Sequence, residues 1–294
     1  MDDCADIPRK DYLGTVADLY EQNRPRYPPD VVTTILLSLQ EDPIDATIAD
    51  VGCGTGIFTR QLARHVEHSC RVVGVEPNTS MREQARVATA AGSGIEYKAG
   101  TAEHMPFHDG ECLVITAATA ASWFDRPRFY HEVVRVIRPN GVLALVQNRR
   151  AFWASESLAA LESLLEEATP SYRRGTHYDP AGGFRGVDYA SELAASPEFG
   201  PVIGRTWEWK QKMSASQFIG LCLSLSVAQE GIRGIGQRAF MDKLDELTQR
   251  FCDAGGAMEV PFVTELTLTT VRSKTSAIGS ALEKIVGCSK RELD

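Results

Sequence analysis

Short apolar runs alternate with amphipathic segments along the first half of the chain. The runs are rich in β-branched residues and predict five strands, over residues 47–51, 71–75, 95–99, 112–117 and 142–146. In the segments between them, apolar side chains recur every three or four residues, as in helices that bury one face. Because strands and helices alternate at this rhythm, we expect a parallel sheet that is covered by helices on both faces.

The alternation is lost after Gln147. Three later segments carry amphipathic helical patterns: residues 155–168, 215–227 and 237–252. Residues 170–188 are rich in Gly, Arg and Tyr and predict a long loop. We expect these later helices to lie over the carboxyl ends of the strands as a lid.

Two more strands are expected in this second half. Residues 202–213 and 259–271 alternate between apolar and polar positions, which predicts an antiparallel pair joined to the sheet. The expected fold class is therefore α/β, with a seven-stranded, mostly parallel sheet, an antiparallel last strand and a helical lid inserted after strand five. We expect four parts: a leader that covers the site (1–46), a core (47–147), a lid with the substrate-binding region (148–258), and a final strand with its tail (259–294).

Composition limits the classes of partner that the protein is expected to bind. The 294 residues include 31 Lys and Arg against 39 Asp and Glu, a net charge of −8. Nucleic acid is therefore not expected as a partner, because phosphate binding needs clustered positive charge. No apolar stretch reaches the roughly 20 residues of a membrane-spanning helix, and residues 1–11 lack a signal-peptide pattern, so no membrane partner is expected. The 7 cysteines are scattered without a C-x-x-C pair, which favours reduced thiols, no bound metal and a cytoplasmic location. We expect a monomer or a homodimer.

The most specific feature is the run D-V-G-C-G-T-G at residues 50–56, between the first strand and a helix. Its glycines let the backbone pass close to a ligand, because no Cβ stands in between. In an open α/β sheet, ligands lie beyond the carboxyl ends of the strands. Ile57 stands in place of the third glycine of a dinucleotide fingerprint, so the loop suits a nucleoside without requiring a pyrophosphate.

Polar residues follow the next strands at the same edge. Glu76 comes directly after the second strand, where a carboxylate can accept two hydrogen bonds from ribose hydroxyls. Residues 100–107 follow the third strand and border the position of a base. Residues 117–124 follow the fourth strand, where backbone carbonyls can meet an ammonium group.

These landmarks, in this order, resemble class I S-adenosylmethionine-dependent methyltransferases, and most closely the type 11 small-molecule branch with its trans-aconitate-like and ubiquinone-like enzymes. The resemblance rests on D-V-G-C-G-T-G, on E-P after the second strand, on G-x-A-E-x-x-P-F after the third and on R-V-I-R-P-N-G-V-L after the later helix. The leader Y-x-x-x-R-P-x-Y-P at 20–28 and the W-F-D run at 123–125 match it as well. It covers about residues 12–147 and implies a Rossmann-like fold with S-adenosyl-L-methionine as cofactor.

The resemblance also implies which residues contact the cofactor. Asp50 would orient the methionine ammonium, Arg24 would pair with the methionine carboxylate, and Glu76 would hold the ribose hydroxyls. Glu103 would accept a hydrogen bond from the adenine amino group. The implied cofactor-binding residues are Tyr20, Arg24, Asp50, Gly52, Gly54, Gly56, Glu76, Pro77, Met81, Thr101, Ala102, Glu103 and Ala117.

The implied reaction is methyl transfer to an O, N, S or C nucleophile of a small organic metabolite. The acceptor pocket is expected between the leader, Trp123 and residues 150–185, whose aromatic content favours an apolar or aromatic acceptor. The expected substrate contacts are Tyr27, Trp123, His177, Tyr178 and Trp207. No catalytic residue is singled out, and the available bases stay open: His131, His177, Tyr178, Asp179 and Glu208.

Two other classes of function stay open. One is an NAD-dependent oxidoreductase of the same sheet type, against which the glycine spacing and the lack of a Tyr-x-x-x-Lys pair weigh. The other is a non-catalytic protein that kept the cofactor fold as the partner of a methyltransferase. The motif residues argue for cofactor binding in this second class too, but they do not distinguish it from an enzyme.

Overall fold

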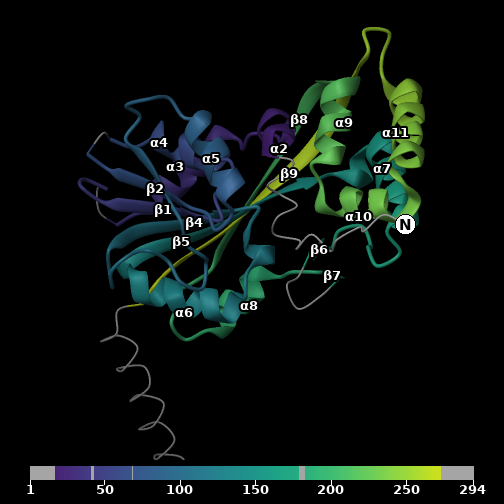
Figure 1. Cartoon of the computed structure of the whole chain (residues 1–294). Coiled ribbons are helices and arrows are strands. Elements are labelled where there is room, and N and C mark those ends of the chain that lie inside the picture. Colours follow the sequence, from purple (N-terminus) through teal and green to yellow (C-terminus); the bar gives the residue numbers. More distant parts are fainter. Residues whose placement is uncertain (1–16, 41–42, 68, 179–182, 273–294) are drawn as a thin grey trace, which may run out of the picture.

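A computed structural model describes residues 17–40, 43–67, 69–178 and 183–272 of the chain. Its centre is a sheet of seven strands in the order β3-β2-β1-β4-β5-β9-β8 (Figure 1). The strands are β1 (Thr47–Val51), β2 (Arg71–Val75), β3 (Ile95–Lys98), β4 (Cys112–Ala118), β5 (Ile137–Arg150), β8 (Ile203–Ser214) and β9 (Ala257–Thr270). The predicted α/β sheet of seven strands is confirmed.

The strand directions follow the prediction as well. Strands β1 to β5 pair in parallel, whereas β9 pairs antiparallel with both of its neighbours, β5 and β8. All five residues of β1 are buried, as expected of a strand that helices cover on both faces. The largest difference in bounds is at β5, which begins at Ile137, where it pairs with Cys112, and runs on to Arg150 because β9 pairs with it as far as that residue.

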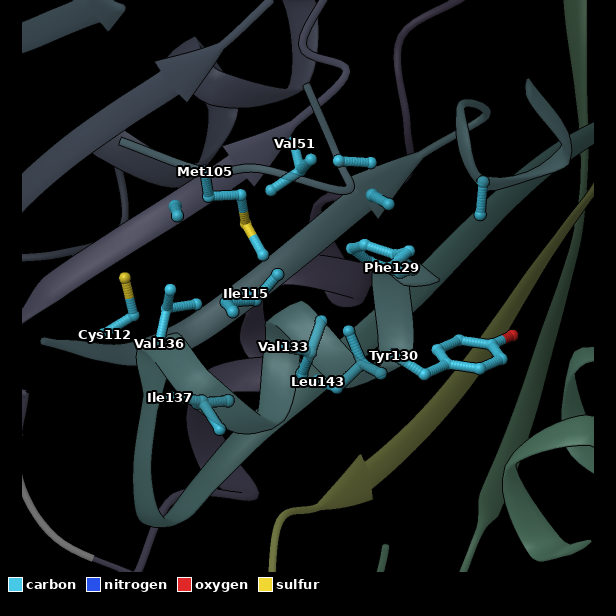
Figure 2. Close-up of a cluster of buried hydrophobic side chains, with 14 of the residues drawn as sticks. Val51, Met105, Cys112, Ile115, Phe129, Tyr130, Val133, Val136, Ile137 and Leu143 are labelled. Carbon is cyan, nitrogen blue, oxygen red and sulfur yellow. The ribbon is translucent and has the colours of Figure 1, made fainter. Parts of the chain in front are cut away.

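Helices cover the two faces of the sheet. The first half of the chain forms α2 (Ala17–Asn23), α3 (Pro29–Leu37), α4 (Ile57–Ala63), α5 (Thr79–Val87) and α6 (Arg126–Val136). Figure 2 shows how Phe129 and Val133 of α6 pack against Ile115 and Leu143 of the sheet. On the other face, α3 and α4 bury apolar side chains against the same strands. Both faces of the central strands are thus buried under helices, so a ligand can reach these strands only at their ends.

A second cluster of helices lies beyond those ends (Figure 1). It contains α7 (Glu156–Ala168), α9 (Ala215–Leu223), α10 (Ser226–Ile235) and α11 (Gln237–Phe251), which share a buried apolar core. We call these four helices the lid cluster. The remaining elements are α8 (Tyr189–Ala195) and a short hairpin of β6 (His177–Tyr178) and β7 (Phe184–Arg185).

The helix predicted over residues 215–227 is in fact two helices. The amide of Ser224 bonds back to the carbonyls of Gly220 and Leu221 and ends α9, and α10 then starts at an angle of 85°. The bend lets Phe218 and Val227 both face the buried core of the lid cluster. In the described part of the chain no single helix could cross a membrane; this bent pair meets the length and composition criteria only jointly.

Three other expectations concern the loop of 170–188, the two ends of the chain and the division into domains. The hairpin of β6 and β7 lies inside the predicted loop of 170–188, and α8 follows it unpredicted. The expected leader and tail lie partly outside the described residues, at 1–16 and 273–294. The division of the chain at residues 46, 147 and 258 stays a prediction.

Candidate functional site

A cavity of about 250 Å³ lies at the carboxyl ends of the central strands, between the sheet and the lid cluster. Its wall combines the loops after β1, β2 and β4 with the end of β5 and with residues of α7, α10 and the hairpin. The predicted site residues that line it are Tyr20, Arg24, Gly52, Gly54, Glu76, Met81, Trp123, His177 and Tyr178. The fold therefore brings together residues from both halves of the chain.

The glycine loop shapes one end of the cavity. Gly54 has a φ of +54°, which L side chains rarely adopt, and a Cβ there would face open space, with Tyr20 Cε1 as its neighbour at 4.0 Å. At Gly52, by contrast, a Cβ would come within 2.7 Å of the Cβ of Ala120. The loop thus forms a cradle that a larger side chain at position 54 would fill.

Glu76 lies at the wall of this cradle and is only 8% exposed. Its Oε2 accepts a hydrogen bond from the amide of Gly54 at 3.0 Å, and its Oε1 accepts one from the amide of Asn78 at 2.9 Å. Asn78 also caps α5, because its side chain accepts from the amide of Met81 at 3.0 Å. A carboxylate has about four acceptor positions, so Glu76 can hold the loop and also accept from ligand hydroxyls.

Asp50 is buried under the glycine loop. Its two oxygens accept the hydroxyls of Thr59 at 2.6 Å and Thr116 at 2.8 Å, which connects β1 to α4 and β4. Burial raises the pKa of Asp50 to about 6. The side chain borders a smaller cavity of about 40 Å³ beside Tyr20 and Arg24. Asp50 therefore has a structural role in the loop, and its contact with an ammonium stays a prediction.

Arg24 reaches both cavities from the leader. Its Nη2 donates to the carbonyl of Ser224 at 2.8 Å, and its guanidinium lies 4.7 Å from the ring centre of Tyr20. Its Nε is buried without a hydrogen-bond partner, and no carboxylate of the described residues pairs with it. Burial lowers the pKa of this guanidinium. Since a buried cation without a counter-ion is costly, the position suits the carboxylate of a ligand.

Tyr27 lies behind the main cavity rather than in it. Its hydroxyl bonds to that of Thr119 at 2.9 Å, and its ring borders the smaller cavity. Thr119, with a φ of +54°, follows β4 and lines both cavities. The structure therefore places Tyr27 beside Arg24 and Asp50, outside the main cavity where the acceptor is expected.

Some predicted residues do not line either cavity: Gly56, Pro77, Thr101, Ala102, Glu103, Ala117 and Trp207. Gly56 starts α4 in a left-handed conformation, and Glu103 accepts a hydrogen bond from the amide of Asp125 at 2.9 Å. Trp207 belongs to the outermost strand and packs against the apolar cluster under α3 and α4. The expectation that Trp207 forms a substrate wall is therefore not met by its position.

The far end of the cavity is aromatic. The rings of Trp123 and Tyr178 lie 4.5 Å apart, and Phe184 packs edge-on to Tyr178 at 6.1 Å. Nδ1 of His177 lies 3.3 Å from the side-chain nitrogen of Gln147. Burial, together with the positive charges of Arg149 and Arg150 at the end of β5, lowers the pKa of His177 to about 4, so its ring is neutral at neutral pH.

The other candidate bases lie elsewhere. His131 is exposed on α6, and Glu208 is exposed on β8. Asp179 lies outside the described residues. Of the open candidates that the structure describes, only His177 and Tyr178 line the cavity.

Sequence reasoning missed the polar residues at the end of β5 and their partners in the lid cluster. Arg149 and Arg150 line the cavity. The carboxylate of Glu162 in α7 accepts hydrogen bonds from the guanidinium of Arg150 and from the hydroxyl of Tyr172. The signal was present in the sequence, because the apolar run of the fifth strand ends in Q-N-R-R at the sheet edge where ligands bind.

Comparisons with known proteins agree with this geometry. Residues 49–145 match the family model described as a methyltransferase domain. An uncharacterized methyltransferase of Mycobacterium tuberculosis is 35% identical over 138 residues, which are 47% of this chain and 52% of that protein. A ubiquinone/menaquinone biosynthesis C-methyltransferase of Hahella chejuensis is 28% identical over 143 residues, 44% of this chain and 57% of that protein. The chain thus spans about half the length of the curated relatives it matches.

Solved structures share the fold. A structure from Anaeromyxobacter dehalogenans, assigned to the type II methyltransferases, is 22% identical with a TM-score of 0.61, over 85% of this chain and 97% of that one. Phosphoethanolamine N-methyltransferase 2 of Haemonchus contortus, in complex with S-adenosyl-L-methionine, is 15% identical with a TM-score of 0.53, over 91% and 60% of the two chains. The solved structures thus show a shared fold, and the glycine loop and the acid after β2 both lie within residues 49–145, the part of the chain that is similar to the methyltransferase-domain family.

Proposed function

We propose that this protein transfers a methyl group from S-adenosyl-L-methionine to an O, N, S or C nucleophile of a small organic metabolite. One observation carries the proposal: a single cavity is bordered by the glycine loop and Glu76 at one end and by Trp123 and Tyr178 at the other. A donor held in the cradle and an acceptor held by the aromatic end would therefore meet in the same cavity. The family supplies the donor, since S-adenosyl-L-methionine is its methyl source.

The residues at the cradle fit this cofactor. Glu76 would accept from the ribose hydroxyls, while Gly54 lets the backbone approach the nucleoside. Arg24, buried and without a carboxylate partner in the described part of the chain, would pair with the methionine carboxylate. Met81 lines the cavity beside Glu76 and would cover a face of the base.

The chain's contribution to the reaction is mainly positional. The cofactor supplies a methyl group on a positively charged sulfur, whose departure as a neutral thioether needs no acid. Holding the acceptor in line with that methyl group is worth several kcal/mol of barrier, roughly 7 or more in favourable cases. Trp123 and Tyr178 would hold a flat apolar or aromatic part of the acceptor, and their rings in contact form one wall. A base is needed only if the nucleophile must lose a proton early.

The rival functions are separated by ligand binding. Calorimetry with S-adenosylmethionine, S-adenosylhomocysteine and NADH should show binding of the first two only. Glu76→Ala should weaken S-adenosylhomocysteine binding by about 2–3 kcal/mol, because a charge-assisted contact to the ribose is lost. Tight binding of NADH would instead support the oxidoreductase, and unchanged affinity of Glu76→Ala would contradict the cofactor assignment.

Gly54→Val has a matched control. Gly92 has a φ of +78°, and a Cβ there meets nothing within 4 Å, so Gly92→Val carries similar backbone strain away from the cavity. We expect Gly54→Val to abolish S-adenosylhomocysteine binding while Gly92→Val retains it. Turnover is then tested by a mass shift of one methylene on metabolites incubated with labelled cofactor, which the non-catalytic alternative would not give.

A further inference from the structure

Three arginines line the cavity although the protein as a whole is acidic, and two carboxylates, Glu76 and Glu162, line it with them. The chain has a net charge of −8, yet Arg24, Arg149 and Arg150 all border the same cavity. If Arg24 serves the methionine carboxylate, as proposed above, the guanidinium groups of Arg149 and Arg150 remain on the cavity wall, and Arg150 also borders the smaller cavity beside Arg24.

Arg150 is held in place and still has a donor to offer. Its Nε and Nη2 donate to Oε1 of Glu162 at 3.1 and 2.7 Å. Oε2 of that carboxylate accepts the hydroxyl of Tyr172 at 2.6 Å, so both oxygens of Glu162 are engaged. Nη1 of Arg150 has no hydrogen bond within the described residues. One edge of the guanidinium is therefore fixed, and the remaining nitrogen is available to a ligand.

Arg149 is arranged in the same way one residue earlier. Its Nη1 bonds to Glu265 at 3.1 Å, and the carboxylate side chain is 41% exposed to solvent. Nη2 of Arg149 makes no hydrogen bond within the described part of the chain and lies beside Gly175 at the cavity wall. After burial, the charges of these two arginines also contribute to the low pKa of His177 on the same cavity wall.

We propose that Arg149 and Arg150 bind an anionic group of the methyl acceptor, a carboxylate or a phosphate, while Trp123 and Tyr178 contact its apolar part. This inference rests on the proposed function and names the substrate class of the same site. The physical reason is that guanidinium donors match carboxylate and phosphate oxygens, and that partly buried cations gain most from a bound anion. Glu162 acts as a positioning residue, because it fixes Arg150 without facing the ligand as a free acid.

The experiment uses matched anionic and neutral probes with the full chain. Benzoate, phenyl phosphate and neutral benzamide are titrated by calorimetry in the presence and absence of S-adenosylhomocysteine. We expect benzoate or phenyl phosphate to bind at least about tenfold more tightly than benzamide, as charge-assisted hydrogen bonds imply. The tighter of the two anionic probes identifies the group as carboxylate or phosphate.

The variants test the two arginines. Arg149→Gln, whose partner Glu265 is solvated, and the double variant Arg150→Gln with Glu162→Gln, which removes both buried charges, should each lose the preference for the anion. Arg205→Gln is the control, because Arg205 is exposed on β8 and outside both cavities. S-adenosylhomocysteine affinity should be unchanged in all three.

Each result decides one question. Equal binding of anionic and neutral probes, or a preference that survives in both cavity variants, overturns the inference while the proposed function stands. A loss of S-adenosylhomocysteine affinity in the double variant would show that Arg150 holds the cofactor carboxylate instead, which also overturns it. Absence of S-adenosylhomocysteine binding in the unmodified protein contradicts the proposed function, whereas the probe titrations without it still test the anion site.

Discussion

The two ends of the cavity are built by different means. At the glycine-loop end, Glu76 accepts from backbone amides and Gly54 sits in a left-handed conformation, so main-chain groups within a short stretch of sequence set the geometry. At the lid end, Arg150 of β5 donates a hydrogen bond to Glu162 of α7, whose carboxylate also accepts one from the hydroxyl of Tyr172. There the geometry depends on side chains that meet only after the lid cluster has packed.

This difference decides how each end responds to change. At the end built from backbone groups, the loss of one side chain should cost little folding stability. A side chain added at the glycine loop should instead block ligand binding. An end built from a buried ion pair loses stability when one partner is removed, because the other charge is left without compensation. The comparison therefore separates effects on binding from effects on folding.

The largest effect is expected at the lid end. Glu162→Ala should lower the free energy of unfolding by about 3–5 kcal/mol, because Arg150 is left buried without its counter-ion. Urea denaturation followed by circular dichroism measures it. The double variant with Arg150→Met should recover much of the loss. Equal losses in the single and the double variant would mean that the ion pair is not the cause.

The next effect concerns pH, with opposite signs at the two ends. The pKa of Asp50 is raised by burial from 3.8 to about 6, so the folded state binds more protons than the unfolded state between these values. Stability from this group therefore falls as the pH rises from about 4 to 6, by about 3 kcal/mol in full. The pKa of His177 is lowered from 6.5 to about 4, so its contribution rises with pH over nearly the same window, by a similar amount of about 3 kcal/mol.

Single variants separate these two slopes. In the unmodified protein they largely cancel, whereas Asp50→Asn should leave stability rising between pH 4 and 6.5 and His177→Gln should leave it falling. Unfolding free energies measured at half-unit steps of pH test both. Identical pH profiles for the two variants would contradict the assignment of opposite signs.

The smallest effect is expected on the affinity for aromatic probes when each of two tryptophans is replaced. Trp123→Phe alters the wall beside Tyr178 and should weaken binding of aromatic probes by about 1 kcal/mol, as for the loss of part of an aromatic pair. Trp207→Phe lies against the cluster under α3 and α4 and should leave probe affinity unchanged. Calorimetric titration of benzoate measures both. An equal loss in Trp207→Phe would restore that residue to the substrate wall.

Much of the fold and part of the site could be predicted because their signals are local. The bounds of β1 and β2 follow directly from runs of buried β-branched residues, and the order of the motifs fixes which strand end each one follows. The loop glycines and Glu76 then meet at one edge, since parallel neighbours end on the same side of the sheet. The bend between α9 and α10 escaped prediction, because both segments carry a continuous apolar pattern and only packing divides them.

The sequence by itself determined the parallel core, its antiparallel last strand and the glycine-loop end of the cavity, because periodicity and backbone conformation are properties of neighbouring residues. Tertiary structure alone decided that Tyr27 and Trp207 lie outside the main cavity, and that Arg149 and Arg150 line it. Partners such as Arg150 and Glu162 come from different elements, and their contact depends on how the end of β5 and the lid cluster pack together. That packing is set by burial of the whole apolar surface, which no short motif encodes.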